Sequence, residues 1–106
     1  PALPSDPGHA LWKAHYKGAS GLFSAVLEPT PRKALAAMLD GLQLFGMGYS
    51  WGGYESLIVP FNPRQCRTAT EWRDEGPALR LHIGLDDPQD LIADLEAGFA
   101  RLKSAA

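Results

Sequence analysis

Arg80 and the residues around it form a pattern suited to binding a small anion. Apolar and polar residues alternate in segment 78–84, which predicts a β-strand with its leucines on one face. Arg80 and His82 are then expected on the opposite face. A guanidinium on a sheet face can hold a carboxylate through two parallel hydrogen bonds. The same pattern also fits a solvated arginine on an exposed face.

A glycine-rich stretch, residues 46–54, is the second candidate for a binding element. Its sequence, GMGYSWGGY, invites comparison with phosphate-binding loops. The comparison fails, because Trp51 stands where a dinucleotide-binding loop needs its third glycine, and no Lys-Ser or Lys-Thr pair follows. The mixture of small and aromatic residues suits a loop whose backbone approaches a ligand closely. The alternative is a tight connection whose aromatic rings pack on the core.

The other polar residues do not assemble a catalytic centre. His82 could be an acid, a base or a ligand, although a bystander role fits the pattern better. His9 and His15 are six residues apart, so a helix would not place them together as a metal pair. Cys66 is the only cysteine, which excludes an internal disulfide and a thiolate zinc site, and no general base lies near it in the sequence. The carboxylates on or just before the last predicted helix fit a cap and a solvent-exposed face: Asp86, Asp87, Asp90, Asp94 and Glu96.

The composition predicts one folded domain that binds neither nucleic acid nor membrane. The chain has 106 residues, 45% of them hydrophobic, which is enough for a real core. A net charge of −2 argues against a nucleic-acid partner, and ten aromatic residues argue against disorder. No segment has the length and apolar character of a membrane span, and the start of the chain does not resemble a signal peptide. With a single cysteine, a reducing, cytoplasmic setting is expected.

The predicted elements place the two candidate segments on one sheet. Apolar spacing, prolines and glycines predict a helix at 7–16 capped by Asp6, strands at 22–27, 45–47, 55–59 and 78–84, and helices at 30–42 and from 88 onward. Pro60 is expected to end its strand, Asp86 or Asp87 to cap the last helix, and residues 69–74 to form a helical turn. The expected fold is α/β of the α+β type, a two-layer sandwich with a mainly antiparallel sheet of three or four strands. Helices would cover one face only, which leaves the other face free to associate weakly.

Three motifs in this order resemble the Cys/Met metabolism family of pyridoxal-phosphate-dependent enzymes. They are GYSWGGYESL at 48–57, RLHIGLDD at 80–87 and DLIADLE at 90–96. The resemblance is to the C-terminal domain of the cystathionine β-lyase branch and runs from about residue 1 to residue 102. The γ-synthase and γ-lyase branches typically carry leucine where this chain has Trp51, and serine where it has His82.

The resemblance implies a function for the intact protein. Members of this branch, which serve methionine biosynthesis, cleave cystathionine to homocysteine, pyruvate and ammonia, and form homotetramers. Arg80 would hold the substrate α-carboxylate and so orient the Cα–H bond, while the cofactor supplies the electron sink. Ser50 would lie near the cofactor-bound lysine and the substrate amino group. Trp51 would border the carboxylate, and Tyr49 would line the pocket.

The resemblance also implies what this chain does not supply. The family's Schiff-base lysine, its phosphate-binding loop and its other cofactor contacts lie upstream of the matched region. We therefore expect residues 1–106 to be the C-terminal small domain of a fold-type I enzyme. The large domain would be absent, and this fragment would have no catalytic residue and no bound pyridoxal phosphate. A methionine γ-lyase or sulfhydrylase small domain, or a free-standing module that binds a small carboxylic acid, are the alternatives.

Overall fold

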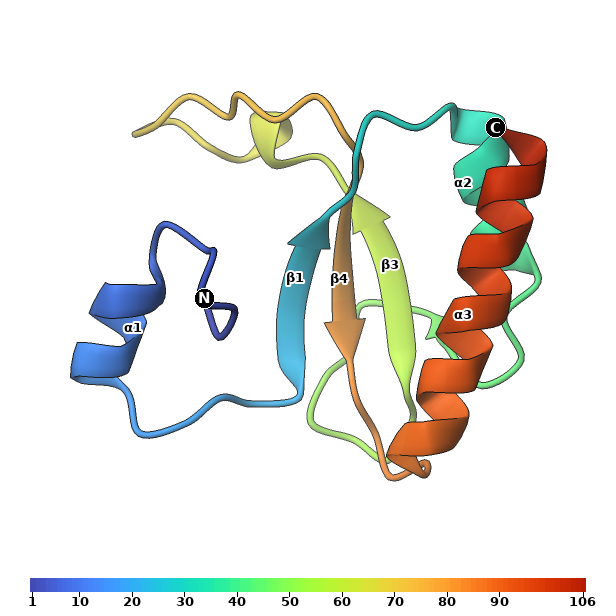
Figure 1. Ribbon diagram of the computed structural model, residues 1–106, viewed down its shortest axis with the longest axis horizontal. Helices are drawn as coiled ribbons and strands as arrows, with labels where there is room; N and C mark the ends of the chain where they lie inside the picture. Colours follow the sequence, from blue (N-terminus) through green and yellow to red (C-terminus); the bar gives the residue numbers. More distant parts are fainter.

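A four-stranded sheet, covered by helices on one face, organises the chain. The computed structural model describes residues 1–106, with the elements α1 (His9–His15), β1 (Leu22–Val26), α2 (Arg32–Asp40), β2 (Gly46–Met47), β3 (Leu57–Phe61), the 3₁₀ turn η1 (Pro63–Gln65), β4 (Ala78–His82) and α3 (Pro88–Ala105). The strand order is β1-β4-β3-β2, with β4 antiparallel to both neighbours and β2 parallel to β3. Helices α2 and α3 pack side by side against the sheet (Figure 1). This confirms the expected two-layer, mainly antiparallel fold.

The hydrophobic core lies between the sheet and the two long helices. Ile58 on β3 is the cross-strand partner of Leu81 on β4, and both are buried beside Leu79. Met38 and Leu39 from α2, Phe45 and Leu91 complete this cluster. Full burial of a side chain of this size stabilises the fold by about 1.5–3 kcal/mol. The leucines of β4 therefore face the helices, as the alternating pattern predicts, and Arg80 is left on the other face.

Asp94 on α3 is buried and binds the backbone that follows α2. It is 9% exposed, and its carboxylate accepts hydrogen bonds from the backbone N–H groups of Gln43, Leu44 and Phe45 at 2.8–3.3 Å. Burial raises the pKa of Asp94, but these three donors and the charge of Arg101 together lower it below its ordinary value. The expectation that Asp94 belongs to the solvent-exposed face of the helix was wrong, because the chain after α2 needs a partner for its N–H groups.

Arg101 forms a second link between the two helices. Its Nε donates to the carbonyl of Ala37 and its Nη2 to the carbonyl of Met38, both at 3.2 Å. These carbonyls belong to the last turns of α2, where backbone acceptors lack helical partners. A Cβ at Gly41 would lie 2.3 Å from Arg101 Nε, so a glycine there leaves room for the guanidinium. A cation at the end of α2 also complements the helix dipole.

Two local predictions were wrong. Pro60 does not end its strand but pairs with Leu79 within β3. Strand β2 pairs only with Leu57 and Ile58, so beyond them this edge of β3 is free, and an edge tolerates proline. Residues 69–74 form no helical turn, and the only one in that region is η1.

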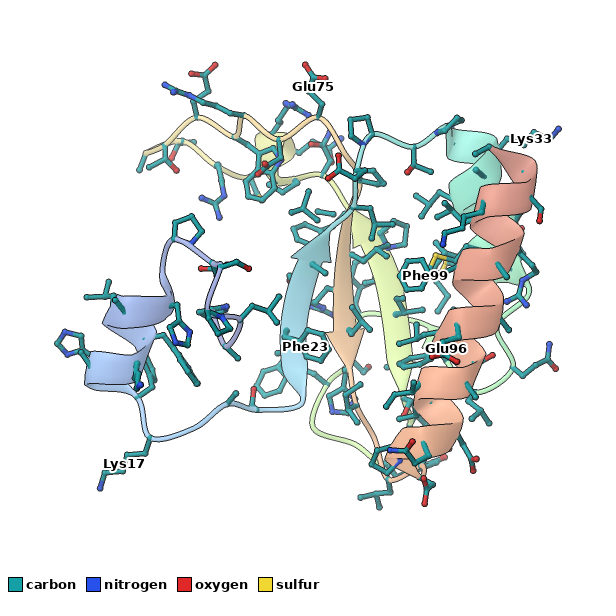
Figure 2. The ribbon with its side chains drawn as sticks, in the orientation of Figure 1. Lys17, Phe23, Lys33, Glu75, Glu96 and Phe99 are labelled. Atoms are coloured by element: carbon teal, nitrogen blue, oxygen red, sulfur yellow. The ribbon has the colours of Figure 1, made fainter.

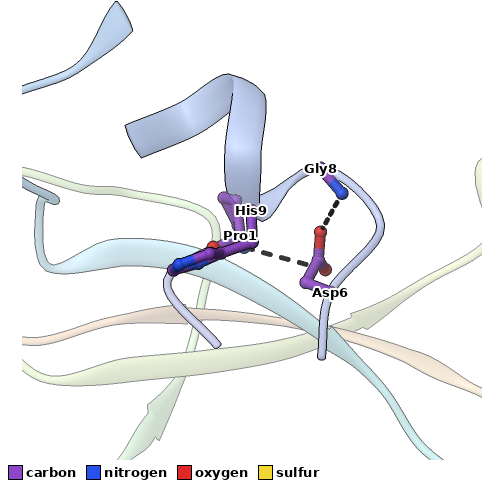
Figure 3. Close-up of polar contacts among 4 residues, drawn as sticks. All are labelled: Pro1, Asp6, Gly8 and His9. Atoms are coloured by element: carbon purple, nitrogen blue, oxygen red, sulfur yellow. Dashed lines mark hydrogen bonds and ion pairs between the residues drawn. The ribbon is translucent and has the colours of Figure 1, made fainter. Parts of the chain in front are cut away.

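The first helix begins later than its capping residues suggest. Its N-cap is Gly8, whose N–H donates to the Asp6 carboxylate at 2.8 Å (Figure 3). The same carboxylate lies 3.8 Å from the N-terminal ammonium of Pro1, whose carbonyl contacts His9 Nδ1 at 2.8 Å. Asp6 therefore organises the turn before α1 instead of capping the helix itself.

The face of the sheet opposite α2 and α3 carries no helix, and α1 covers neither face. Helix α1 lies beyond β1, on the side away from α3, and none of its residues is buried (Figure 1). Phe23 on β1 is 46% exposed although it lies on the helix side, because the long helices do not reach the outer strand (Figure 2). None of the helices combines the length and the apolar character that crossing a bilayer requires.

Candidate carboxylate-binding site

A cavity of about 300 Å3 lies on the open face of the sheet around Arg80. Strand pairing places Ser24 of β1, Arg80 of β4 and Val59 of β3 at the same level across three strands. These side chains line the cavity together with Phe61 from β3 and Tyr49 from the glycine-rich loop. One guanidinium therefore lies in a hollow that is otherwise neutral and partly apolar.

The guanidinium of Arg80 is positioned by the loop and has no acidic partner within the chain. Its Nη2 donates to the backbone carbonyl of Tyr49, and the Tyr49 ring centroid is 5.7 Å from its central carbon. Both contacts restrict the rotamers of a half-buried side chain. The chain's only ion pairs lie elsewhere, at Pro1–Asp6 and Arg73–Glu71. The charge of Arg80 and its remaining N–H donors are thus available to an external anion.

The glycine-rich loop leaves its aromatic rings in solvent. Tyr49, Trp51 and Tyr54 are 66–72% exposed, so the alternative in which these rings pack on the core was wrong. Gly52 has φ of 81°, a left-handed conformation that glycine adopts at little cost. The structure brings Tyr49 and Arg80 together, whereas Ser50 and Trp51 lie on the exposed loop beside the cavity and do not line it.

His82 holds this loop against the sheet. It is only 7% exposed, and its Nε2 accepts a hydrogen bond from Gly52 N–H at 2.8 Å. Its Nδ1 lies 2.9 Å from the carbonyl of Glu55, to which it can only donate. The interpretation of His82 as a bystander was therefore wrong. The one signal in the sequence was its position on the same face as Arg80, two residues further along the strand.

A second group of bonds, which the sequence did not reveal, fixes the base of the loop. Ser56 is buried, and its hydroxyl donates to Asp86 Oδ2 at 2.6 Å and accepts from Gly84 N–H at 3.0 Å. The N–H of Leu85 donates to the carbonyl of Tyr54 at 2.9 Å. A Cβ at Gly84 would lie 2.0 Å from that carbonyl oxygen, so this close approach requires glycine. Asp86 thus helps to fix the base of the glycine-rich loop through its bond to Ser56.

Asp87, the other candidate for the helix cap, is the residue that caps α3. Its carboxylate accepts from Gln89 N–H at 2.8 Å, and Pro88 occupies the first turn of the helix. Of the two aspartates that the sequence proposed for this role, one therefore caps the helix and its neighbour binds Ser56.

The remaining polar residues form no cluster of metal ligands. No three histidine, cysteine or acidic side chains gather as metal ligands, and Cys66 is an exposed free thiol. The four lysines are all exposed, and none lines the cavity at Arg80. Figure 2 shows two of them, Lys17 and Lys33, at opposite extremes of the molecule. The residues that line the cavity therefore suit recognition of a carboxylate.

Comparison with known proteins agrees with this geometry. A family model described as "Cys/Met metabolism PLP-dependent enzyme" matches residues 1–100. Cystathionine beta-lyase of Salmonella typhimurium is 53% identical over 106 residues, which cover 96% of this chain and 27% of that protein. L-alanine/L-glutamate racemase of Wolbachia pipientis wMel is 46% identical over 104 residues, with 96% and 26% covered.

A solved structure extends the agreement to the fold. Cystathionine gamma synthase of Xanthomonas oryzae pv. oryzae, crystallised with cystathionine, superposes with a TM-score of 0.76 at 34% identity, covering 99% of this chain and 28% of that one. The chain spans about a quarter of the length of the curated relatives it matches. Its sheet and its helices are thus those of the small domain of fold-type I pyridoxal-phosphate enzymes, and the chain belongs to the Cys/Met metabolism family of pyridoxal-phosphate-dependent enzymes.

Proposed function

We propose that the chain is the C-terminal, substrate-binding domain of a cystathionine β-lyase-like enzyme. The intact enzyme would cleave the Cβ–S bond of cystathionine and release homocysteine, pyruvate and ammonia, in the cytoplasm. The observation that carries the proposal is the guanidinium of Arg80, half-buried in a neutral cavity with no acidic partner. The Salmonella relative, whose name states this activity, supports the choice of substrate.

Arg80 would bind the α-carboxylate of the substrate. A guanidinium presents donors in a planar fork that matches the two oxygens of a carboxylate. The Tyr49 carbonyl takes one of these donors and so fixes the plane of the fork. Ser24 adds a hydroxyl at the same level on the neighbouring strand, while Val59 and Phe61 limit the access of water. A carboxylate held at two oxygens fixes the direction of the Cα substituents, which is the contribution of this domain to the reaction.

Two residues of the exposed loop would contact the substrate once the rest of the enzyme closes the site. Trp51 would border the carboxylate, and Ser50 would lie near the substrate amino group. Both side chains are exposed and make no side-chain hydrogen bond within the chain. They are therefore free to contact a ligand or another domain without breaking an internal bond.

Residues outside this chain would hold the cofactor. The family depends on pyridoxal phosphate, but every lysine here is exposed and away from the Arg80 cavity. We therefore assign no cofactor contact and no chemical step to residues 1–106, and we expect this segment alone to bind no cofactor. The missing large domain would cover the open face of the sheet, and the intact enzyme would be a homotetramer.

A second candidate is amino-acid racemisation. A racemase is 46% identical to this chain over 104 residues, so the same small domain accompanies a different reaction in a relative. Both reactions begin with an amino acid whose carboxylate must be held, and Arg80 serves either of them. Trp51 and His82 favour the β-lyase branch over the γ-synthase and γ-lyase branches, which typically carry leucine and serine there.

The test uses the full-length protein that contains this chain. Release of pyruvate from cystathionine is expected, and loss of chirality from L-alanine or L-glutamate is not. An Arg73→Lys variant, which changes an exposed arginine away from the cavity, serves as the matched control for Arg80→Lys. Racemisation without pyruvate would support the second candidate. A reading frame of only about 106 codons would instead favour a free-standing carboxylate-binding module.

A further inference from the structure

The imidazole of His82 connects the sheet to the glycine-rich loop through both ring nitrogens. A backbone carbonyl can only accept and a backbone N–H can only donate. The Glu55 carbonyl therefore places the ring proton on Nδ1, and Gly52 N–H requires a lone pair on Nε2. Both bonds exist together only while the ring is neutral. A second proton, on Nε2, would face the Gly52 donor and break that bond.

Arg80 and His82 hold the loop at two different points. Arg80 binds the carbonyl of Tyr49, and His82 binds the N–H of Gly52 three residues later. Both side chains project from the same face of β4, so one strand sets the position of the loop between these two points. Ser50 and Trp51 lie between them, exposed and without other side-chain hydrogen bonds. Loss of the His82 bond would leave this segment held at only one end.

The charged and titratable groups near His82 form no ion pair with its ring. Its cross-strand partners are both leucines, Leu22 on β1 and Leu57 on β3. Arg80 is the nearest charged residue of its own strand, and the loop contributes Glu55, Tyr49 and Tyr54. Asp86, after the strand, is engaged by the Ser56 hydroxyl. No carboxylate pairs with the imidazole, and α2 and α3 pack on the opposite face of the sheet.

We propose that His82 is a positioning residue whose neutral imidazole keeps the segment from Tyr49 to Trp51 beside Arg80, and that protonation of the ring releases this segment. His82 does not touch the substrate. It acts through Gly52, and the kinetic consequence rests on the proposed function of Arg80.

The first test measures backbone hydrogen exchange in the intact protein, independently of activity. His82→Leu removes both bonds, whereas His82→Gln keeps an amide oxygen that can accept from Gly52 and does not titrate. Peptides covering residues 49–55 should exchange roughly tenfold faster in His82→Leu than in the wild type. Peptides from β3 should not change, and His82→Gln should restore most of the protection. Equal exchange of residues 49–55 in all three proteins would overturn the proposal.

The second test is the pH dependence of cystathionine cleavage. Between about pH 8 and about pH 5, kcat/KM of the wild type should fall roughly tenfold further than that of His82→Gln. KM should rise more than kcat falls, because the loop positions substrate. His15→Gln, an exposed histidine on α1, is the control and should follow the wild type. Identical profiles for the wild type and His82→Gln would refute the release step. Absence of cleavage with the exchange results intact would refute only the proposed function.

Discussion

Replacing Asp94 with asparagine should destabilise the fold by about 2–5 kcal/mol. The carboxylate accepts backbone N–H groups of Gln43, Leu44 and Phe45, and it is buried between α3 and the chain that leads into β2. Asparagine has nearly the same shape, so the packing of α3 should survive. It keeps one acceptor oxygen but presents an NH2 group to the remaining backbone donors, which then have no partner.

The magnitude follows from the bonds that are lost. A hydrogen bond to a charged group contributes about 1.5–3 kcal/mol, and a buried donor left without a partner costs about 1–3 kcal/mol. Since one oxygen remains and bonds at one carboxylate are not additive, about 2–5 kcal/mol is expected. The free energy of unfolding of a domain of 106 residues is about 5–15 kcal/mol. The loss expected for Asp94→Asn is therefore a large fraction of the stability of the fold.

The same carboxylate predicts how stability changes in acid. The hydrogen-bond donors and Arg101 outweigh burial, so the pKa of Asp94 is lowered in the folded state. The stability it contributes is therefore fully present above the ordinary aspartate pKa of about 3.9. It is lost as the pH falls through the lower folded value. Asp94→Asn lacks this group, so its stability should vary less across that acid window than the wild type's.

Urea unfolding, followed by circular dichroism at neutral pH and at several pH values below 4, measures both the loss of stability in Asp94→Asn and its dependence on pH. Glu96→Gln is the matched control, because Glu96 is an exposed acid on the same helix and should leave the midpoint unchanged. An Asp94→Asn midpoint equal to that of the wild type at neutral pH would show that water replaces the lost bonds. Parallel pH curves would show that another carboxylate governs acid unfolding.

Three further predictions concern the site and the open face. In the intact enzyme, Arg80→Ala should lower kcat/KM by roughly 30-fold to several thousand-fold, and Arg80→Lys nearly as much, because about 2–5 kcal/mol of charged pairing with the substrate carboxylate is lost. Near-normal kinetics of the lysine variant would show that Arg80 does not bind the carboxylate. Residues 1–106 alone, mixed with pyridoxal phosphate, should develop no stoichiometric absorbance near about 420 nm that disappears with a single lysine. The same segment should associate weakly through its uncovered face, where Val26 of the edge strand is exposed; a strictly monomeric species in sedimentation, with no binding of a hydrophobic dye, would contradict this.

The fold could be predicted because its signals are local. Alternation along 78–82 defined β4 and its two faces, and the apolar spacing of Leu35, Met38 and Leu39 defined the buried side of α2. Pro88, preceded by an aspartate, marked the start of α3. The strand that contains Pro60 was placed too early, because the rule that proline ends a strand assumes partners on both sides. Which edge is free depends on the strand order, and that is not a local property.

The candidate site was only partly predictable, because its supporting bonds join residues far apart in the chain. Arg80 could be chosen from its type and its position on a strand. The bonds of His82 to Gly52 and Glu55 span about 30 residues, as does the bond of Ser56 to Asp86. Each partner is a backbone group or a short side chain whose type carries no signal by itself. The sequence therefore favoured a bystander role for His82, whereas its neighbours in the fold determine that it holds a loop.

Two of the three motifs that carry the resemblance, 48–57 and 80–87, act as one structural unit. Five hydrogen bonds that involve His82, Ser56, Gly84 and Leu85 join the two motifs. A sixth runs from Arg80 to the carbonyl of Tyr49. Gly84 is needed because the backbone at Tyr54 passes too close for any side chain. Substitutions in either motif should therefore be coupled, and a double-mutant cycle between residues 52 and 82 should give a non-additive free energy. Additive effects on the unfolding free energy would show that the two segments lie side by side without depending on each other.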